Sequence, residues 1–214
     1  MQPSTTPRAK TIRRREPLNP ERIARAALEL IDETGLEEFS TRRLGKVLGV
    51  EGMALYKHFE SREALLDAVS ELLISSIIIP KKGSGWAERV RIFARQYRSI
   101  ARMHPKAYPL LAMRRLGTEK SLMLIDDVFA ALLEEGFEAQ EAAFLFRTVG
   151  NYCNGTALDE LAIMAQLQTG APRVIPHGEV DAFLHPAYFD TQFEAGLDLI
   201  LDGFARRRAR RKES

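Results

Sequence analysis

The amino-acid sequence predicts an all-α protein, and three observations support this fold class. Apolar residues recur at spacings of three and four positions in almost every segment between Pro20 and Phe204, as on one face of a helix. No run alternates polar and apolar residues with period two, so we predict no strands. Residues 80–85, Pro-Lys-Lys-Gly-Ser-Gly, interrupt the helical pattern and indicate a linker between two helical regions.

Length and composition indicate an ordinary globular protein of 214 residues, 45% hydrophobic and 28% charged. The single cysteine, Cys153, excludes an internal disulfide and is consistent with the reducing cytoplasm. The N-terminal arginines lack the apolar segment of a secretory signal. The longest apolar stretch, residues 72–79, contains Ser75 and Ser76 and is far shorter than the about 20 residues that span a membrane. We therefore expect a soluble cytoplasmic protein with no membrane partner.

Positive charge is concentrated at the two ends of the chain. Residues 1–16 contain five basic residues and one acidic residue, and residues 206–214 contain six and one, although the whole chain carries only +2. Basic arms of this kind attract the phosphates of nucleic acids. The alternative is a pair of disordered, solubilising tails, and for the C-terminal one both interpretations stay open. We expect residues 1–17 to be disordered without a partner.

The first helix is predicted by its start and stop signals. Asn19 is suited to an N-cap, Pro20 to the first helical position, and Gly35 to the end of the helix. Its inward-facing residues are expected to be Ile23, Ala27, Leu30 and Ile31.

Residues 39–59 predict two short helices joined by a tight turn. Ser40 is suited to capping the first of them, and Gly49 to the turn, because a left-handed backbone brings no Cβ clash at glycine. Leu44, Val47 and Leu48 are expected to face inward. The second helix is expected to reach about Phe59. Such a pair is typical of a helix-turn-helix.

The second helix of this pair has two different faces. Leu55 and Phe59 lie one turn apart on the inward face, and Met53, Ala54 and Lys57 lie on the opposite face. Tyr56 and His58 fall on the two edges. From Phe39 to Arg62 there are five basic and two acidic residues, a balance that favours DNA over a merely solvated surface.

The remainder of the chain is predicted to be helical. A helix capped by Ser61 is expected to run to about Ile78, and one ending at His104 follows the linker. Next come a short segment over residues 107–116 and a stripe of Leu122, Ile125, Phe129, Leu132 and Leu133 closed by Gly136. Residues 140–168 form a long helix that is apolar on more than one face, residues 169–186 a loop, and the residues from Phe189 onward a last helix.

The segments Ser-Thr-Arg-Arg-Leu-Gly-Lys-Val-Leu-Gly-Val-Glu (40–51), Ala-Leu-Tyr-Lys-His-Phe (54–59) and Arg-Glu-Ala-Leu-Leu-Asp (62–67) resemble the DNA-binding domain of TetR-family transcriptional regulators. The resemblance covers about residues 20–68. It implies a disordered basic arm (1–17), a three-helix DNA-binding domain (18–64), a ligand-binding and dimerisation domain (65–205) and a basic tail (206–214). It also implies that DNA is contacted by Thr41, Arg42, Met53, Tyr56, Lys57, His58 and Arg62.

The later segments Gly117-Thr-Glu-Lys120, Leu-Leu-Glu-Glu-Gly-Phe137 and Val-Gly-Asn-Tyr-Cys-Asn-Gly155 resemble the tetracycline-repressor branch of that family. Those repressors hold a magnesium–drug chelate with a histidine shortly before Thr-Glu-Lys. Here Leu-Ala-Met-Arg-Arg-Leu-Gly precedes it, so we expect no tetracycline–magnesium site. His177 and His185 have no Cys or Glu at metal-ligand spacing, and we assign neither metal nor cofactor.

The resemblance implies a homodimer that binds a palindromic DNA operator and is released by a small-molecule effector. The dimer is expected to form through residues 140–168 and the last helix, where Gly196 and Gly203 either permit close approach of the partner or pack within one subunit. The effector is expected between helices of residues 86–168. Candidate ligand-binding residues are Phe93, Tyr97, Met103, His104, Met113, Phe129, Thr148, Asn151 and Asn154.

Several of these candidates have a simpler interpretation. Asn151 and Asn154 are polar amides on a largely apolar helix. They either face the ligand, or bond to neighbouring backbone or lie at the dimer seam. His104 either lines the site or only ends its helix. Cys153 is expected to be an inert core residue rather than a redox sensor.

The sequence therefore predicts a ligand-responsive DNA-binding transcriptional regulator, most simply a repressor. The alternative is a DNA-binding activator or architectural regulator without a small-molecule ligand. No nucleophile motif, phosphate-binding loop or metal cluster supports an enzyme.

Overall fold

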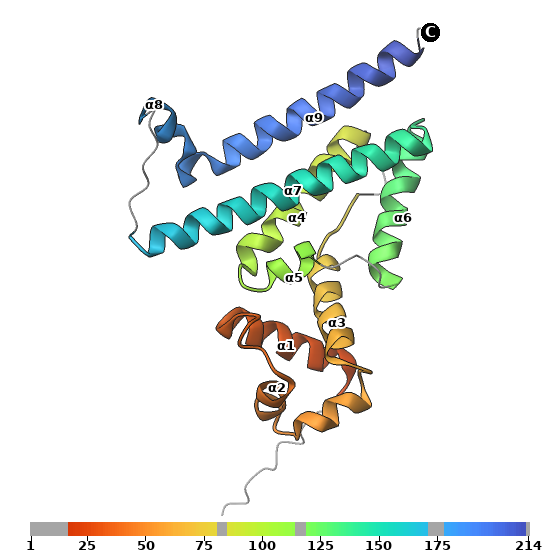
Figure 1. The fold of residues 1–214 in the computed structure, drawn as a ribbon. Helices are drawn as coiled ribbons and strands as arrows, with labels where there is room; N and C mark the ends of the chain where they lie inside the picture. Colours follow the sequence, from red (N-terminus) through yellow and green to blue (C-terminus); the bar gives the residue numbers. More distant parts are fainter. Residues whose placement is uncertain (1–16, 81–84, 114–118, 171–177, 213–214) are drawn as a thin grey trace, which may run out of the picture.

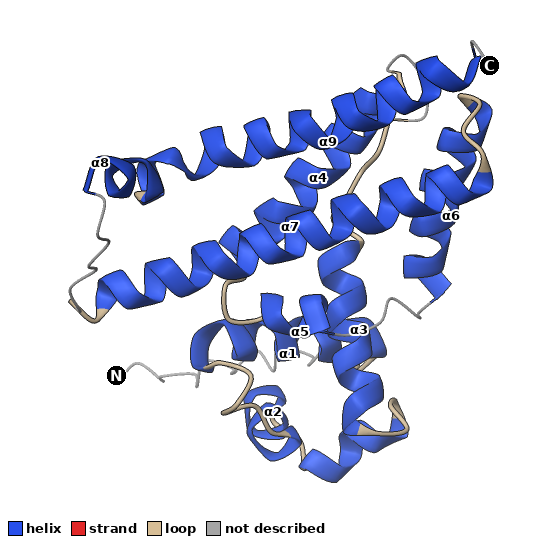
Figure 2. Ribbon diagram, turned by 45° about the horizontal axis from the view of Figure 1, so that its top comes forward, coloured by secondary structure: helices blue, strands red, loops and turns tan. Residues whose placement is uncertain are grey.

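The computed structural model describes residues 17–80, 85–113, 119–170 and 178–212 (Figure 1). Helices connected by loops and turns account for all of these residues, and no strand occurs within the described ranges (Figure 2). The prediction of an all-α protein is therefore confirmed. The basic arm at residues 1–16, residues 81–84 of the linker and the Gly117-Thr118 part of the tetracycline-repressor-like motif lie outside the described residues.

The N-terminal end of the molecule consists of α1 (Pro20–Thr34), α2 (Thr41–Leu48), the 3₁₀ helix η1 (Gly52–Lys57) and α3 (Arg62–Ile74). Each α-helix begins at the expected cap. The side-chain oxygens of Asn19, Ser40 and Ser61 accept backbone N–H bonds at 2.8, 3.3 and 3.0 Å, which satisfies one otherwise unpaired donor in each first turn.

Two predictions for this region are wrong. The segment after the turn is the short 3₁₀ helix η1 rather than an α-helix reaching Phe59, because backbone bonds of the i→i+3 type close it at both ends. Val47 is 60% exposed instead of buried, because the eight residues of α2 contact the core mainly through Leu44 and Gly45. Gly49 occupies the turn with φ +70°, as expected.

Helix α3 ends at Ile74, one turn earlier than predicted. The hydroxyls of Ser75 and Ser76 donate to the carbonyls of Leu72 and Leu73 at 2.9 and 2.7 Å, so these serines satisfy the last turn with their side chains. The following connection is held against α4 (Trp86–Met103) by Gln96. Its side-chain amide both accepts from the backbone N–H of Ile78 (2.8 Å) and donates to the carbonyl of Ile78 (2.7 Å).

The larger, C-terminal part is a layered helical bundle (Figures 1 and 2). Helix α4 packs on α7 (Ala139–Gln168), and α7 packs on α9 (Phe189–Lys212), while α5 (Tyr108–Met113) and α6 (Glu119–Glu134) flank them. Part of the segment predicted as a loop is helical, in α8 (Gly178–Asp181), η2 (Ala182–Leu184) and η3 (Pro186–Tyr188).

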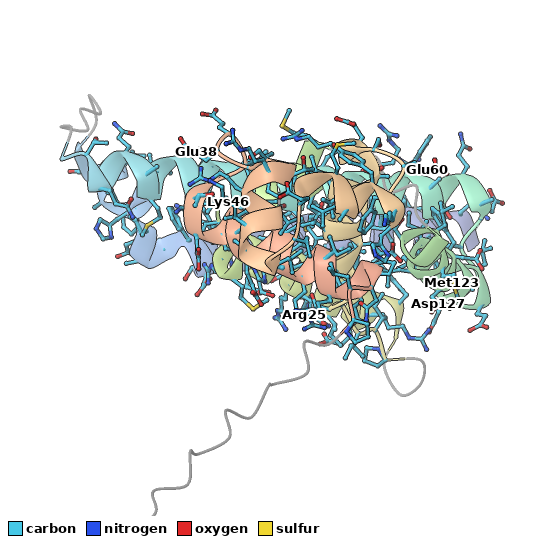
Figure 3. The ribbon with its side chains drawn as sticks, turned by 90° about the horizontal axis from the view of Figure 1, so that it is seen from below. Arg25, Glu38, Lys46, Glu60, Met123 and Asp127 are labelled. Carbon is cyan, nitrogen blue, oxygen red and sulfur yellow. The ribbon has the colours of Figure 1, made fainter. Side chains whose placement is uncertain are left out.

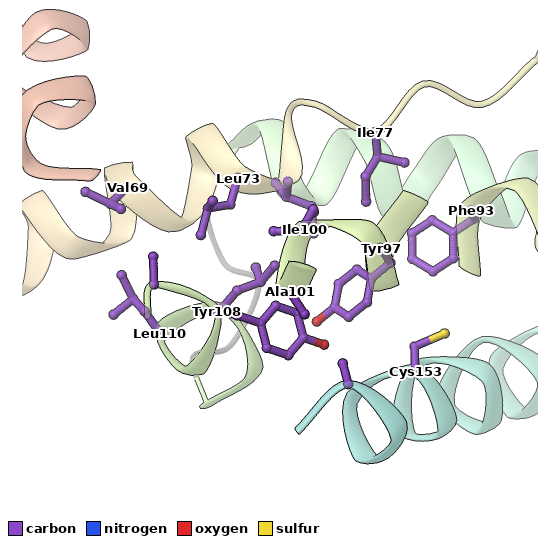
Figure 4. Close-up of a cluster of buried hydrophobic side chains, with 14 of the residues drawn as sticks. Val69, Leu73, Ile77, Phe93, Tyr97, Ile100, Ala101, Tyr108, Leu110 and Cys153 are labelled. Atoms are coloured by element: carbon purple, nitrogen blue, oxygen red, sulfur yellow. The ribbon is translucent and has the colours of Figure 1, made fainter. Parts of the chain in front are cut away.

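One face of α4 lies in the buried core. Six residues of this face are at most 7% exposed: Val90, Phe93, Ala94, Tyr97, Ile100 and Ala101. Figure 4 shows Phe93, Tyr97, Ile100 and Ala101 in this core. The stripe predicted for α6 is partly wrong, since Leu122 and Leu133 are 53% and 48% exposed while Val128 and Leu132 are buried. Val128 and Leu132 form the buried face of α6, and Leu124 and Phe129 pack against the core beside them.

Arginines of α4 are matched by carboxylates of α9 along the length of their contact. Arg91 bonds to Asp198 at 2.5 Å, Arg95 to Glu194 at 2.7 and 2.9 Å, and Arg98 to Asp190 at 2.8 Å. Arg98 also holds the buried Glu160 of α7 at 2.8 Å, and its guanidinium lies 4.5 Å from the centre of the Phe193 ring. These contacts fasten three helices together.

Helix α9 continues to Lys212, so most of the segment predicted as a basic tail is helical. The guanidinium of Arg208 lies 3.9 Å from the centre of the Phe137 ring and donates to the carbonyl of Glu135 at 2.5 Å. Arg211 forms ion pairs with Glu138 and Glu141 at 2.5 and 3.2 Å. These two arginines therefore hold the end of α9 against the start of α7.

Candidate nucleic-acid interface and ligand-binding interior

The contact between α2 and η1 depends on two glycines. A Cβ atom on Gly45 would lie 2.8 Å from the carbonyl oxygen of Val50, and one on Gly52 would lie 3.1 Å from that of Thr41. Only glycine permits so close an approach of two backbones. Sequence reasoning missed this role, although a glycine in the middle of a short amphipathic helix was a signal for it.

This packing leaves one side of the helix-turn-helix exposed at the end of the molecule seen in Figure 3, where Lys46 and Glu38 of the same region are labelled. Leu55 is 1% exposed and anchors η1, whereas Met53 and Tyr56 are 75% and 39% exposed. Arg42 and Lys57 are also exposed. Hydrophobic, aromatic and cationic groups are thus presented together, as DNA-contacting surfaces require.

The other predicted DNA contacts lie at the edges of this surface. Thr41, His58 and Arg62 are each partly exposed, at the starts of α2 and α3 and the end of η1. The Arg62 guanidinium lies 5.6 Å from the centre of the Phe39 ring, which restrains a side chain that would otherwise be free to rotate. Arg43 forms an ion pair with Glu38.

The interior between α4, α5 and α7 contains a small polar cluster, in which Asn154 meets the hydroxyls of Tyr97 and Tyr108. Figure 4 shows these two tyrosines close to Cys153. The hydroxyls of Tyr97 and Tyr108 both donate to the side-chain oxygen of Asn154 at 2.9 Å. Burial raises the pKa of Tyr97 to about 12 and raises the pKa of Tyr108 as well, so both hydroxyls stay protonated. The Asn154 side chain is therefore held by two tyrosine side chains rather than by neighbouring backbone groups.

Cys153 lies beside this cluster and is fully buried. Burial raises the pKa of its thiol to about 12, and the sulfur lies 3.9 Å from the carbonyl oxygen of Ala94. Because the thiolate is the reactive form, a protonated and buried thiol is a poor nucleophile. This agrees with the interpretation of Cys153 as an inert core residue.

The nine candidate ligand-binding residues are not all brought together. Phe93 and Phe129 both stack near Phe146, with ring centres 6.4 and 5.1 Å from it, and Tyr97 adjoins Phe93 at 5.7 Å. By contrast, four candidates have exposed side chains and do not reach this interior: Met103, Met113, Thr148 and Asn151.

His104 lies at the junction with the DNA-binding end. Its backbone N–H closes α4 at 2.8 Å from the carbonyl of Ile100, and its Nδ1 lies 2.7 Å from a carboxylate oxygen of Asp32 in α1. The neighbouring Lys106 donates to the carbonyl of Glu33 at 2.6 Å. His104 thus ends its helix, as one interpretation held, and also joins α4 to α1.

A small apolar cavity lies between α4, α6 and α7. Its volume is about 20 Å³, and its wall includes Val90, Phe93, Val128, Leu132, Phe146 and Val149. Only Phe93 of these was among the sequence candidates. The others were missed because a periodic apolar pattern does not distinguish a residue beside a cavity from one in a filled core.

Gly196 has a role within one subunit. A Cβ atom there would lie 2.2 Å from the Tyr152 hydroxyl, whose proton is donated to the carbonyl of Phe193 at 2.9 Å. The Tyr152 and Phe193 rings are stacked with centres 5.5 Å apart. The close approach at Gly196 therefore joins α9 to α7 of the same chain, whereas Gly203 has open space beside it.

Within the described ranges, no three or more His, Cys, Asp or Glu side chains are grouped so as to hold a metal ion. No helix in the described part of the chain combines the length and apolarity needed to cross a membrane.

The protein has a helix-turn-helix at one end and a larger helical bundle with an interior cavity at the other. This arrangement is typical of transcriptional regulators in which one polypeptide carries both a DNA-binding part and a second domain. Residues 23–69 match the family model "Bacterial regulatory proteins, tetR family", and residues 79–208 match "Tetracyclin repressor-like, C-terminal domain". The chain therefore belongs to the TetR family and is a DNA-binding transcriptional regulator.

Curated relatives agree with this assignment. The chain is 32% identical to the tetracycline repressor protein class A from transposon 1721 of Escherichia coli, across 89% of this chain and 92% of that protein. It is 27% identical to an HTH-type transcriptional repressor of Mycobacterium tuberculosis, across 92% and 84%.

Solved structures show the same fold. A TetR variant from Acinetobacter baumannii in complex with minocycline superimposes with a TM-score of 0.73 at 28% identity, covering 90% of this chain and 99% of that one. A possible TetR-family regulator from Streptomyces coelicolor gives 0.74 at 27% identity, covering 88% and 99%.

Proposed function

We propose that this protein is a homodimeric repressor that binds a palindromic operator and is released from it by a small-molecule effector. The observation that carries the proposal is the exposed face of the helix-turn-helix, where Arg42, Met53, Tyr56 and Lys57 are presented on a rigid α2–η1 contact. The regulators that it resembles include tetracycline repressors and a mycobacterial repressor. Operator DNA lies in the bacterial cytoplasm, so we expect the protein to act there, without catalytic activity.

The side chains of this face suit different parts of a DNA duplex. Tyr56, Lys57, His58, Thr41 and Arg62 carry hydrogen-bond donors that suit phosphate oxygens, and these contacts set position rather than sequence. Met53 offers only apolar contact, for example to a thymine methyl group. The remaining specificity is then expected from Arg42 and from the shape of the DNA.

The proposed dimer interface is formed by α7 and α9. These helices lie side by side along one side of the bundle (Figures 1 and 2). Both expose large apolar side chains in a single chain, including Phe144 at 49%, Met164 at 45% and Leu199 at 70%. Burial of such a surface against a second copy would give the two-fold symmetry that a palindrome requires.

The effector would act through the junction between the two parts of the chain. Helix α3 extends from Arg62 at the DNA-binding end to the connection at residues 75–80, which Gln96 holds against α4. His104 and Lys106 hold the end of α4 against α1. A ligand that favours a different position of α4 would therefore change the spacing of the two DNA-binding ends, provided that it binds the two conformations with different affinity.

The test combines DNA selection with variants of the exposed face. The preferred operator is selected from a random DNA pool, and its affinity is then measured for the wild type and for Tyr56→Ala/Lys57→Ala. We expect a loss of at least about 100-fold, because two phosphate contacts are removed, with the dimer unchanged in sedimentation. Lys57→Ala alone should lower the salt dependence of log K by about one.

The matched control is Arg95→Ala, which removes a cation of α4 that pairs with Glu194 of α9 and should leave operator affinity within about twofold. Normal operator binding by the double variant would refute the interface. A purified transcription assay in which polymerase output rises on binding would refute repression.

A further inference from the structure

We propose that the effector is an uncharged, largely apolar molecule that inserts between α4, α6 and α7 beside Arg89. The proposal rests on the regulatory function above and names the chemical class of the ligand. It contrasts with a charged, metal-chelated drug, because the inner cavity is lined by apolar side chains and one cation, and no three His, Cys, Asp or Glu side chains of the described residues are grouped to hold a metal ion.

The cavity itself excludes charge. Its wall is formed by aliphatic and aromatic side chains such as Trp86, Val90, Phe93, Leu145 and Phe146, and Arg89 is the one ionisable residue among them. An ionised group that entered here would lose its hydration without gaining an adequate set of partners. An apolar molecule loses little on entry, and empty apolar cavities bind such molecules.

A larger groove adjoins this cavity. It has a volume of about 420 Å³ and lies between residues 77–80, Arg89 and the face of α6 that includes Leu124 and Ala131. The cavity and the groove share Ile79, Arg89 and Ala131 in their walls. A modest displacement of these side chains would join the two spaces, and the groove alone is within the about 300–1,000 Å³ of typical small-molecule sites.

The charges at the groove do not favour an anion. Arg89 is accompanied there by Asp127 and Glu134, both on α6. One guanidinium and two carboxylates give this entrance a slight excess of negative charge. A carboxylate or phosphate ligand would therefore gain little from Arg89, whereas a neutral ligand with a polar end could form hydrogen bonds to these groups.

The position of the site links it to the DNA-binding end. Residues 77–80 follow directly after α3, and Ile77 is 6% exposed within the core. A ligand that entered from the groove would push on this connection and on Ala131 of α6. Since α3 begins at Arg62, beside the DNA-contacting face, the same movement would reorient that face.

The experiment uses the full-length protein and two fluorescent probes that differ in charge. N-phenylnaphthylamine is neutral, and anilinonaphthalene sulfonate is a related aromatic anion. Binding of each is followed by fluorescence titration, and folding is checked by circular dichroism. We expect saturable binding of the neutral probe and at least about tenfold weaker binding of the anion.

Three variants locate the bound probe. Val149→Ala enlarges the cavity and should strengthen binding of the neutral probe severalfold, whereas Ala131→Leu fills the shared wall and should weaken it about tenfold. Val69→Ala is the matched control, because it removes the same atoms from an equally buried valine of α3 that does not border the cavity. It should leave probe affinity unchanged.

Opposite shifts for Val149→Ala and Ala131→Leu support the site even if one variant is less stable, because general loosening would strengthen binding in both. Equal responses of Val149→Ala and Val69→Ala overturn it. If the anionic probe binds more tightly than the neutral one and this preference is lost in Arg89→Met, the proposal of an uncharged effector is overturned. Selection of operator DNA without probe tests the regulatory function separately, so failure of the two proposals is distinguishable.

Discussion

At the scale of single residues, the structure of the DNA-binding end depends on two glycines as much as on its larger residues. Gly45 and Gly52 bring α2 and η1 into backbone contact, so that Leu55 can be buried while Met53 and Tyr56 stay exposed. This arrangement fixes the position of the exposed face without using any of its polar atoms. Those atoms stay available for DNA.

Gly45→Ala is expected to destabilise the protein by about 1–3 kcal/mol and to weaken operator binding, because the new Cβ would lie 2.8 Å from the Val50 carbonyl oxygen. Urea denaturation and a gel shift measure the two effects. Gly150→Ala is the control, since open space surrounds that helical position in the chain, and there alanine should stabilise by up to about 1 kcal/mol. Equal stability of both variants would show that the α2–η1 contact can relax.

At the scale of helices, ion pairs are the main side-chain contacts between α4 and α9. The arginines of α4 are spaced so that successive guanidinium groups face Asp198, Glu194 and Asp190 of the antiparallel helix. Most of these pairs are accessible to water and contribute little each. Arg98 and Glu160 differ, since their side chains are only 7% and 9% exposed.

Arg98→Met is expected to cost about 3–5 kcal/mol, because it leaves the Glu160 carboxylate buried beside only the more distant Arg102. Arg95→Met is a matched control on the same helix. It removes a pair with Glu194 whose arginine side chain is 50% exposed, and should cost no more than about 1 kcal/mol. Chemical denaturation compares the two, and similar losses would contradict the special role of Arg98.

The same pairs predict a dependence of stability on acid. Hydrogen bonds from Arg102 and Arg95 hold the pKa values of Asp190 and Glu194 below their ordinary values of 3.8 and 4.5. Carboxylates with a lowered folded-state pKa stabilise the fold fully above the ordinary value, and this stabilisation is lost as pH falls through the folded value. The midpoint of chemical denaturation should therefore fall as the pH is lowered below about 4.5. It should fall less steeply in Glu194→Gln. An identical profile for that variant would exclude Glu194 as a contributor.

At the scale of the whole molecule, the DNA-binding part and the bundle share one buried core, to which α3 contributes Leu73 and α5 contributes Leu110. Specific polar contacts lie beside it. The pair His104–Asp32, the bond from Lys106 to Glu33 and the clamp of Gln96 on Ile78 connect α4 to α1 and to the segment after α3. A junction of this kind can transmit a movement of α4, because packed side chains and specific polar contacts both connect α4 and its neighbours to α1 and α3.

Leu199→Glu is expected to convert the dimer to monomers and to lower operator affinity by at least about 100-fold, because it places a charge on the apolar face of α9, where Leu199 is 70% exposed. Sedimentation velocity and a gel shift measure both effects. The control is Leu122→Glu, at an exposed leucine of α6, which should stay dimeric. A dimeric Leu199→Glu protein would place the interface elsewhere.

Much of the fold was predictable because its signals are local. Asn19, Ser40 and Ser61 cap helices that the chain begins regardless of its neighbours, and Gly49 supplies the left-handed turn. The errors lie where distant segments decide the outcome. Val47 has the spacing of a buried residue, yet it is 60% exposed, and in α6 Val128 is buried whereas Leu122 is exposed.

The helical class and the helix-turn-helix could be predicted from the sequence, because capping and periodicity depend on neighbours along the chain. The residues proposed to contact DNA were indicated by the same local patterns and by the family resemblance. The packed helices were needed to show which glycines carry close contacts, that Arg98 joins three helices, and that the interior cavity is lined by Val90, Val128 and Val149. Close contacts, ion pairs and cavities are relations between residues far apart in sequence. Their geometry exists only once the helices have packed.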